Sequence, residues 1–390
     1  MREYKPVSED LMQITEYNVL APLPNPFMLE DGTEVRTEGD WQKRRQELME
    51  NTVKLQYGEI PPKPEFLEIL PLFPLRQKAG FGTYQIRTGT RENPIIFNLR
   101  IFKPEGEGPF PTVLCGDLGF RYVYDVDYRN AFTDNGILLA EFDRTELAPD
   151  PDKGDPAPFW QGQIFRAYPG QEFYATAVWA WGFLRACDAL EKIGLTDFSC
   201  LAYMGHSRGA KAAMLAGVLD QRATVVNPNS TCAGGCSCYR LNIKAINAEG
   251  KERPSETITI TEKFPTWFSP ELKKYIGRET ELPFDSHFLK ALIAPRVLLD
   301  TEAADDIWGN PVGSWQTTMG AREVYKFLGA EQNLYWHFRE GGHYHSQQDA
   351  EALISLLLHP KNGKALPDTF FKTPFKRPEL MFDWRCPERK

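Results

Sequence analysis

The sequence predicts an α/β fold of three layers, in which a mostly parallel central sheet is covered by helices on both faces. Short apolar or β-branched segments typical of strands recur from about residue 94 to residue 338, and segments with helical periodicity lie between several of them. Strands that alternate with helices in this way are typical of parallel sheets buried on both faces. In such sheets, functional side chains collect at the carboxyl ends of the strands.

Each predicted strand is short and rich in apolar or β-branched residues. In chain order they are PIIFNLRIF (94–102), PTVLCG (111–116), GILLAEF (136–142), CLAYMG (200–205), ATVVNP (223–228), RVLLDTEA (296–303) and NLYWHF (333–338). The predicted helices are EFYATAVWAWGFLRACDALEKIG, the alanine-rich segment after Ser207, WQTTMGAREVYKFLGA and QQDAEALISLLL. A polar, irregular segment at about 230–285 interrupts the alternation, as an insertion over the strand ends would.

The chain divides into three predicted parts. Residues 1–90 form a polar, proline-rich N-terminal extension that packs on the core and contains one helix, DWQKRRQELMENTVKLQYG, from Asp40. Residues 91–365 form the α/β domain, including the insertion at about 230–285. Residues 366–390 form a C-terminal tail.

Composition narrows the class of protein. The 390 residues, 42% of them apolar and 25% charged, are typical of a globular domain with a sizeable core. The net charge of −8 and the lack of a basic run argue against a nucleic-acid partner. Because no 18-residue apolar run occurs and the N-terminus lacks a signal-peptide core, we expect no membrane partner. We expect a soluble monomer with reduced thiols, cytoplasmic as written and secreted if a signal peptide has been removed.

The stretch GHSRG at 205–209 matches the pattern G-x-S-x-G between a predicted strand and a predicted helix. This is the context that a nucleophile elbow requires. Glycines flank the serine because a Cβ in so tight a turn would strike the neighbouring strand or helix. Ser207 would then stand at a helix N-terminus, where free N–H groups favour a developing oxyanion. A serine that only caps a helix needs neither glycine, so we predict that Ser207 is a nucleophile.

A serine hydroxyl needs a base, which is usually a histidine. The histidines are His206, His287, His337, His343, His345 and His359. In this topology the base follows the last strand, which points to REGGHYHSQQ, and either His343 or His345 could serve; the other four are expected to be structural. The H-x-H pair also resembles metal ligands, but no third clear ligand is close by, so we expect no metal and no cofactor.

The third member of a triad is a carboxylate that orients the imidazole and stabilises its charged form. The chain order serine, acid, histidine places it after the strand RVLLDTEA. There the sequence offers Glu302, Asp305 and Asp306. Periodicity does not choose among them.

Further motifs follow one another in a fixed order along the chain. They are FMLEDGTEVRTEGDWQKRRQELMENTVKLQYGEIPP, AVWAWGFLRACDAL, GHSRGAKAAM, AGGCSCYR, FPTWFSPELKKY, LPFDSHFLKALIAPR, DDIWGNPVGS and GGHYHS. In this series, which covers most of the chain, the sequence resembles the glucuronoyl esterases, carbohydrate esterase family fifteen, and especially their bacterial branch. The resemblance implies an α/β-hydrolase fold and, as substrates, esters between 4-O-methyl-glucuronic acid on xylan and lignin alcohols.

The resemblance also implies roles for single residues. Ser207 would be the nucleophile, and Arg208 would supply an oxyanion-hole donor through its backbone N–H and its side chain. Lys211 would contact the uronate. Trp308 would line the sugar site.

For the base and the acid, the resemblance selects among the candidates. The family's catalytic histidine is the second of its G-G-H-x-H, which selects His345, whereas the commoner esterase pattern, with the base directly after glycine, selects His343. We expect His345. Fungal members carry the acid at a position that is Ser230 here, while some bacterial members use an aspartate two residues before the tryptophan, which is Asp306 here.

The sequence departs from the family pattern at other positions. Ala210 stands where the family has a second glycine after the serine, and His206 and Ser346 replace the cysteines of a fungal disulfide. The residues that read sugar hydroxyls in fungal members correspond to Thr257 and Pro265. Proline offers no side-chain hydrogen bond, so these positions bear on the choice of sugar.

Three functional hypotheses follow. The main one is a serine-dependent carboxylic ester hydrolase that acts on plant cell-wall carbohydrate esters, specifically 4-O-methyl-glucuronoyl esters. One alternative keeps the chemistry but changes the substrate to an acetyl or other small-acyl sugar ester. The alternative of another class is a non-catalytic carbohydrate-binding relative.

Overall fold

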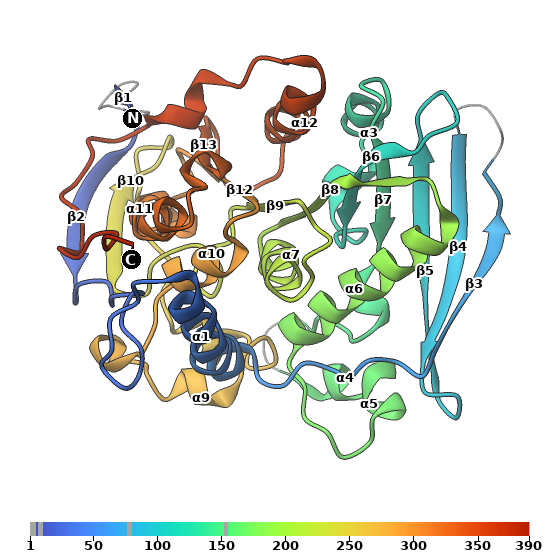
Figure 1. Ribbon diagram of the computed structural model, residues 1–390, viewed down its shortest axis with the longest axis horizontal. Helices are drawn as coiled ribbons and strands as arrows, with labels where there is room; N and C mark the ends of the chain where they lie inside the picture. Colours follow the sequence, from blue (N-terminus) through green and yellow to red (C-terminus); the bar gives the residue numbers. More distant parts are fainter. Residues whose placement is uncertain (1–4, 7–10, 76–79, 152–154, 390) are drawn as a thin grey trace.

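The computed structural model describes residues 5–6, 11–75, 80–151 and 155–389, and a nine-stranded sheet crosses it in the order β13-β12-β9-β8-β6-β7-β5-β4-β3 (Figure 1). The strands are β3 (Phe66–Phe73), β4 (Gly80–Gly89), β5 (Pro94–Lys103), β6 (Phe110–Cys115), β7 (Leu138–Phe142), β8 (Thr196–His206), β9 (Val225–Asn229), β12 (Val297–Ala303) and β13 (Leu334–Arg339). Neighbours from β13 to β7 are parallel, and β5, β4 and β3 continue the sheet in antiparallel pairing. The predicted mostly parallel sheet is confirmed.

Helices cover both faces of this sheet, as Figure 1 shows. On one face lie α6 (Ala175–Ile193), α7 (Arg208–Leu219), α10 (His287–Ile293) and α11 (Pro311–Phe327), and on the other lie α3 (Val126–Thr133) and α12 (Gln347–Asn362). Leu114 belongs to the first apolar core and its neighbour Val113 to the second. Because successive strand residues point to opposite faces, the two cores are the two sides of the sheet, and the predicted three-layer arrangement is confirmed.

Local sequence sets the ends of the helices that border the site. The side chain of Ser346 accepts a hydrogen bond from the backbone N–H of Asp349, whose carboxylate accepts one from the backbone N–H of Ser346. This capping box starts α12 and ends the loop that enters from β13. The long helix α6 ends at Gly194, which adopts the left-handed conformation that helix ends favour (φ 78°).

Residues 66–73 and 80–89, which the sequence assigned to the N-terminal extension, belong to the central sheet as β3 and β4. The extension therefore ends before residue 66 rather than near residue 90. Pro71 conceals β3 in the sequence, because proline is rare within strands and is tolerated here only at the edge of the sheet. Residues 1–4 and 7–10 of the predicted extension lie outside the described residues.

The N-terminal extension and the insertion meet in a second, three-stranded sheet. Its strands are β2 (Gln13–Val19), β10 (Leu241–Ile246) and β11 (Glu252–Pro254), with β10 in the middle and antiparallel to both. The insertion, predicted as irregular, thus contains two strands. It also contains the short helices α8 (Ile260–Lys263) and α9 (Pro270–Lys273), which lie beyond β11 in the chain.

The helix predicted from Asp40 is present as α1 (Glu38–Leu48), which continues through a π-helical turn into α2 (Leu55–Tyr57). Its Trp41 is buried in the main core. The C-terminal tail packs against the extension, where the Nε1–H of Trp384 donates a 2.9 Å hydrogen bond to the carbonyl of Leu23. The described parts of the tail and of the extension are therefore in direct contact.

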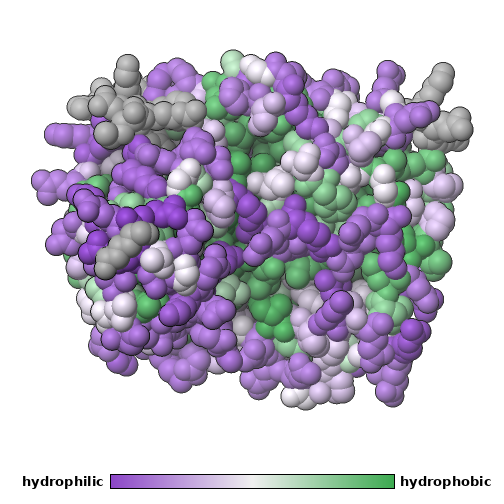
Figure 2. Space-filling view, in the orientation of Figure 1, coloured by the Kyte–Doolittle hydropathy of each residue, from purple (hydrophilic) through white to green (hydrophobic). Residues whose placement is uncertain are grey.

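Polar side chains spread over most of the face seen in Figure 2, with apolar side chains showing between them. No helix among the described residues combines the length and the apolar character needed to cross a bilayer.

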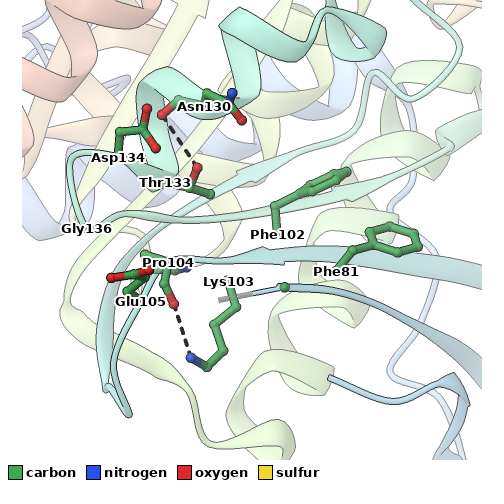
Figure 3. Close-up of a pocket in the computed structure, with 10 residues that line it drawn as sticks. Phe81, Phe102, Lys103, Pro104, Glu105, Asn130, Thr133, Asp134 and Gly136 are labelled. Atoms are coloured by element: carbon green, nitrogen blue, oxygen red, sulfur yellow. Dashed lines mark hydrogen bonds between the residues drawn. The ribbon is translucent and has the colours of Figure 1, made fainter. Parts of the chain in front are cut away.

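One cavity, of about 780 Å³, lies between the end of β5 and the end of α3, with Phe81, Phe102 and Lys103 among its lining residues (Figure 3). Gly136 also lines it and precedes β7, whereas Ser207 follows β8. Because β7 and β8 are both parallel to β6, this cavity lies at the amino ends of the parallel strands and Ser207 lies at their carboxyl ends.

Candidate active site

Ser207 occupies the turn between β8 and α7, in the strand–turn–helix context that its motif predicts. Its backbone is held at φ 55° and ψ −122°, a strained region for a residue with a Cβ. Its N–H donates a 2.9 Å hydrogen bond to the carbonyl of Asn229, at the end of the neighbouring strand β9. The turn therefore fixes the serine at the carboxyl edge of the sheet.

The two flanking glycines make this turn possible. A Cβ on Gly205 would lie 2.5 Å from the carbonyl oxygen of Gly209, and a Cβ on Gly209 would lie 1.7 Å from the Oδ1 of Asp117. Asp117 is fully buried and its Oδ2 accepts the backbone N–H of His206 at 2.6 Å. The elbow is thus tied to the end of β6 as well as to β9.

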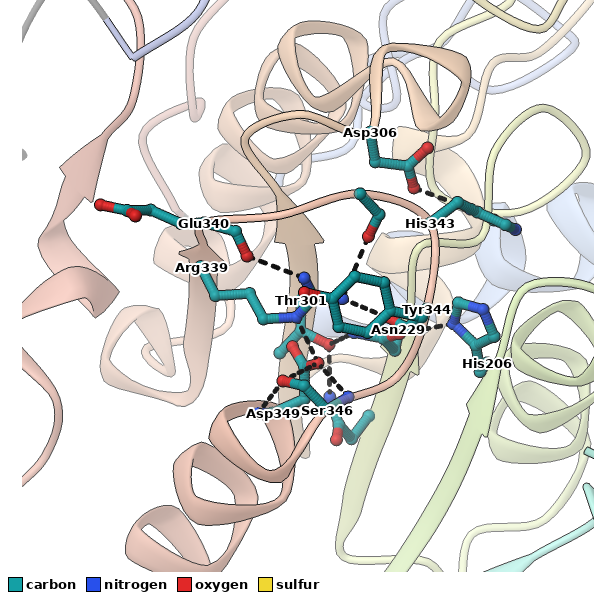
Figure 4. Close-up of polar contacts among 12 residues, drawn as sticks. His206, Asn229, Thr301, Asp306, Arg339, Glu340, His343, Tyr344, Ser346 and Asp349 are labelled. Atoms are coloured by element: carbon teal, nitrogen blue, oxygen red, sulfur yellow. Dashed lines mark hydrogen bonds and ion pairs between the residues drawn. The ribbon is translucent and has the colours of Figure 1, made fainter. Parts of the chain in front are cut away.

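His343 and Asp306 complete a chain of hydrogen bonds that begins at Ser207. The Nε2 of His343 lies 2.9 Å from the Oγ of Ser207, and its Nδ1 lies 2.8 Å from the Oδ2 of Asp306. Figure 4 shows the Asp306 carboxylate pointing at the His343 ring. Asp306 is almost fully buried, while the side chain of His343 remains 35% exposed. This arrangement allows His343 to take a proton from Ser207 while Asp306 stabilises the resulting charge.

The structure contradicts the expectation that His345 is the histidine in contact with Ser207. The ring of His345 is buried, stacked on Tyr122 with 4.7 Å between ring centroids and edge-on to Tyr128. Burial lowers the pKa of His345 to about 3, so the ring is neutral at physiological pH. The alternate, His343, is the residue that reaches the serine.

The loop that carries both histidines is held by Arg339, a residue that the sequence did not single out. Its Nε donates to the Oδ2 of Asp349 at 2.6 Å, and its Nη atoms donate to the carbonyls of Glu340, Gly342 and Tyr344. Figure 4 shows Arg339 inside the curve of this loop. Arg339 therefore fixes the backbone from which His343 projects.

Protonation of His345 should make the fold less stable in acid. The unfolded chain binds a proton at this histidine below about pH 6.5, and the folded chain binds it only near pH 3, so stability is lost as the pH falls between these values. We expect His345→Phe to reduce the slope of unfolding free energy against pH, between about pH 4 and 5.5, by about 1.4 kcal/mol per pH unit. Urea unfolding across this range measures the slope, and an unchanged slope contradicts the expectation.

The three candidate acids lie in different environments. Burial opposes the ionisation of Asp306, but the hydrogen bond and charge of His343 and the backbone N–H of Gly309 hold its pKa below the usual value. Asp305 instead accepts the backbone N–H of Ala248 at 2.7 Å. At Glu302, burial and then the charges of Asp300 and Asp306 raise the pKa well above its usual value. Only Asp306 is both ionised and bonded to His343.

Arg208 follows the serine directly, at the first position of α7. Its guanidinium carbon lies 4.5 Å from the centroid of the Trp267 ring and 5.2 Å from that of Phe264. Its Nη1 donates a 3.0 Å hydrogen bond to Asp150, which the sequence did not single out. The backbone N–H groups at this helix start and the nearby guanidinium are suited to an anion beside Ser207.

Lys211 and Trp308 lie on the same side of the site but differ in exposure. Lys211 is buried; its Nζ donates to the carbonyl of Thr231 and lies 3.8 Å from Glu256. The backbone N–H of Glu256 donates to the carbonyl of Trp308 at 2.9 Å. Trp308 is 38% exposed, and the Nζ of Lys263 lies 4.4 Å from its ring centroid. Glu256 carries no sequence signal, because a lone glutamate in a polar segment resembles a solvated side chain.

The positions at which the sequence departs from the family pattern are structured without a disulfide. His206 is buried, with its Nδ1 2.6 Å from the Oδ1 of Asn229, and Ser346 caps α12. The hydroxyl of Ser230 is buried and makes no hydrogen bond to a described residue. The cysteines are all free, and the described residues contain no group of three side chains arranged to hold a metal.

The remaining histidines make contacts away from Ser207. His287 bonds to the carbonyl of Pro24 through Nε2, His337 bonds to the hydroxyl of Thr369 through Nδ1, and His359 bonds to the carbonyl of Lys364 through Nδ1. Burial lowers the pKa of His287 and of His337 to about 4.

Comparison with known proteins gives one family. A family model of fungal glucuronyl esterases matches residues 86–329. 4-O-methyl-glucuronoyl methylesterase 1 of Phanerochaete chrysosporium is 29% identical over 331 residues, which are 83% of this chain and 66% of that protein. The 4-O-methyl-glucuronoyl methylesterase of Podospora anserina is 29% identical over 358 residues, which are 87% of this chain and 69% of that protein. The chain spans about two thirds of the length of these curated relatives.

Solved structures agree over nearly the whole chain. A glucuronoyl esterase of carbohydrate esterase family 15 from Caldicellulosiruptor kristjansonii has a TM-score of 0.78 and 26% identity, covering 97% of this chain and 100% of its own. A variant of the Sporotrichum thermophile glucuronoyl esterase, solved with methyl 4-O-methyl-β-D-glucopyranuronate, has a TM-score of 0.73 and 24% identity, covering 95% and 94%. At 24% identity, the likeness to the Sporotrichum thermophile structure is evidence for the fold alone.

Proposed function

The chain belongs to the glucuronyl esterase family, and from this membership we propose that it is a serine-dependent carboxylic ester hydrolase acting on 4-O-methyl-glucuronoyl esters of plant cell walls, in which the uronic acid of xylan is esterified to lignin alcohols. The observation that carries the proposal is the pair of hydrogen bonds from Ser207 to His343 and from His343 to Asp306. The names of the curated relatives and the uronate ester bound by the Sporotrichum thermophile protein support this choice of substrate.

In the first half of the reaction, the Oγ of Ser207 attacks the ester carbonyl carbon while its proton passes to the Nε2 of His343. Asp306 stabilises the imidazolium through its Nδ1–H. The carbonyl oxygen becomes an oxyanion, which the backbone N–H and the guanidinium of Arg208 stabilise. When this intermediate collapses, the bond to the alcohol oxygen breaks, and the alcohol leaves with the proton from Nε2.

In the second half, water replaces the alcohol. His343 takes a proton from a water molecule whose oxygen attacks the carbonyl carbon of the acyl-enzyme, and a second oxyanion forms in the same position. Its collapse breaks the bond to the Oγ of Ser207, which recovers the proton from Nε2. The products are the free uronic acid and the alcohol, and the enzyme returns to its starting state.

Recognition of the sugar is assigned to the polar and aromatic groups beside the serine. Lys211 and Glu256 provide a buried donor and acceptor, and the exposed ring of Trp308 provides an apolar face suited to a pyranose. A buried polar pair of this kind strongly favours substrates that carry a matching hydroxyl, because a substrate that lacks it leaves the buried groups without a hydrogen-bond partner.

A second candidate function, a small-acyl carbohydrate esterase, is favoured by one pair of positions. Pro265 has no side-chain donor or acceptor, and the hydroxyl of Thr257 is engaged with that of Thr259 at 2.8 Å. Both positions bind sugar hydroxyls in the fungal pattern that this sequence resembles. The site therefore offers fewer polar contacts there to a uronate.

Two esters with the same leaving alcohol separate these candidates. We expect kcat/KM for benzyl glucuronate to exceed that for benzyl acetate by at least about tenfold, because only the uronate ring uses the binding groups beside Ser207. Steady-state rates with purified protein measure both values. A preference for the acetate supports the small-acyl esterase instead, and the shared benzyl alcohol ensures that leaving-group reactivity does not cause the difference.

A further inference from the structure

A buried row of alternating charges runs from the ends of β6 and β7 to Arg208. Arg144, in the short helical turn after β7, donates from Nη1 to the Oδ1 of Asp117 at 2.8 Å. Its Nη2 lies 3.7 Å from the Oδ2 of Asp150. That same oxygen accepts the 3.0 Å hydrogen bond from the Nη1 of Arg208. Asp117 in turn accepts the backbone N–H of His206, so the row begins and ends on residues that flank Ser207.

Asp150 also holds the aromatic surface on which Arg208 lies. Its Oδ1 accepts a 3.0 Å hydrogen bond from the Nε1–H of Trp267. The Trp267 ring stacks on Phe264 with 3.9 Å between centroids and an interplanar angle of 4°. One carboxylate therefore binds the edge of the guanidinium and the indole beneath it, so it fixes both the position and the tilt of the charged group.

Arg208 needs such support because its side chain is long and only partly enclosed. The Arg208 side chain is 26% exposed, whereas that of Asp150 is 9% exposed. A free arginine side chain loses rotamer entropy on being held in one orientation. A charge-assisted hydrogen bond to a buried carboxylate offsets this entropy loss in the free enzyme, before substrate binds.

We propose that Asp150 is a positioning residue that holds the Arg208 guanidinium, through Arg208 itself and through Trp267, where it meets the oxyanion. The inference rests on the proposed function, since it assigns to Asp150 a part of that same site. Asp150 touches no reacting atom in the proposed reaction; it acts through Arg208.

Removing Asp150 would have two opposing effects on kcat. Loss of a negative charge beside Arg208 would strengthen the attraction of the guanidinium for an oxyanion and raise kcat. Loss of position would lower kcat, since a displacement of about 1 Å costs on the order of a hundredfold. Because the carboxylate fixes both the guanidinium and its aromatic support, the positional effect dominates.

The experiment compares Asp150→Ala and Asp150→Asn with a matched pair elsewhere in the fold. Asp220, at the far end of α7, has a side chain that is 7% exposed and likewise accepts from an arginine, Arg222, and from an aromatic side chain, Tyr203. On benzyl glucuronate we expect Asp150→Ala to lower kcat about 10- to 100-fold with little change in KM. Asp220→Ala should lower the Tm similarly but leave kcat within about twofold.

A double variant tests whether Asp150 acts through Arg208. In the Arg208→Ala background, adding Asp150→Ala should cause no further fall in kcat. Equal falls in both backgrounds, or a rise in kcat in Asp150→Ala, would overturn the proposal. Asp150→Asn, which keeps one acceptor oxygen, should lie between the parent and the alanine variant.

A probe that does not depend on the substrate separates this inference from the proposed function. A fluorophosphonate labels an activated serine, and its phosphoryl oxygen occupies the oxyanion position. Its labelling rate should fall about 10- to 100-fold in Asp150→Ala and remain unchanged in Asp220→Ala. If the probe labels the parent but the parent does not hydrolyse benzyl glucuronate, the substrate assignment fails while the test of Asp150 still stands. If the probe labels the parent and Asp150→Ala at the same rate, the positioning role of Asp150 fails.

Discussion

Replacing Ser207 with alanine is expected to lower kcat on benzyl glucuronate by about 10⁶-fold. Removal of a serine nucleophile has this magnitude because the remaining triad members act only through its hydroxyl. The loss should fall on kcat and not on KM, since the hydroxyl forms a bond in the transition state and contributes little to binding the ground state. Alanine accepts the strained backbone at φ 55° no worse than serine does, so the elbow should keep its shape.

Ser230 supplies the matched control for that variant. It is a buried serine at the end of the neighbouring strand β9, it also has a positive φ of 47°, and its hydroxyl makes no hydrogen bond to a described residue. Ser230→Ala should therefore keep kcat within a few-fold of the parent. Thermal unfolding and kcat are measured for both variants. Parental turnover in Ser207→Ala would show that the serine is not the nucleophile.

The elbow and the sheet around it were predictable because their signals are local. Gly205 and Gly209 stand beside Ser207 in the sequence, and the backbone and Asp117 atoms that exclude a Cβ at each are consequences of one tight turn. The central-sheet strands β5 to β9, β12 and β13 were likewise found, because strands covered by helices on both faces are rich in apolar residues, whereas β10 and β11 of the insertion were not found. Strand β3 was missed because it lies at the edge, where a proline is tolerated.

The choice between two histidines depends on contacts that no local pattern contains. His343 and His345 are two residues apart on a glycine-rich loop, and the two motifs that the sequence matches there select different ones. The structure separates them because Arg339 binds the loop carbonyls and Ser346 begins α12, so His345 turns inward under Tyr122. The pattern taken from the resemblance selected His345, whereas the commoner esterase pattern selected His343, which is the histidine that contacts Ser207.

The sequence narrowed the candidates for the triad acid to three residues, and a single turn brings one of them, Asp306, to His343. After β12 the chain enters a 3-10 turn at Ile307–Gly309, and the Oδ1 of Asp306 accepts the N–H of Gly309 at 3.0 Å while its Oδ2 bonds to His343. Asp305 is turned toward the insertion instead, where it accepts the N–H of Ala248. The adjacent aspartates thus have different hydrogen-bond partners, because the turn directs their side chains to different parts of the structure.

His343→Ala is expected to lower kcat on benzyl glucuronate by about 10⁶-fold, and His345→Phe is expected to change it by less than tenfold. Without the His343 imidazole, the proton of Ser207 has no acceptor and the leaving alcohol has no donor, so both halves of the reaction slow. His345 is buried behind the loop and is neutral. Its replacement therefore acts on stability alone.

The two variants differ by two positions on one loop, so each is the control for the other. Both are measured for kcat at a temperature well below their Tm, and circular dichroism shows that each is folded. If the losses were reversed, with His345→Phe inactive and His343→Ala active, the 2.9 Å contact between His343 and Ser207 would not be the one used in catalysis. Because that contact and the one to Asp306 share a single ring, reversal would remove the acid from the mechanism as well.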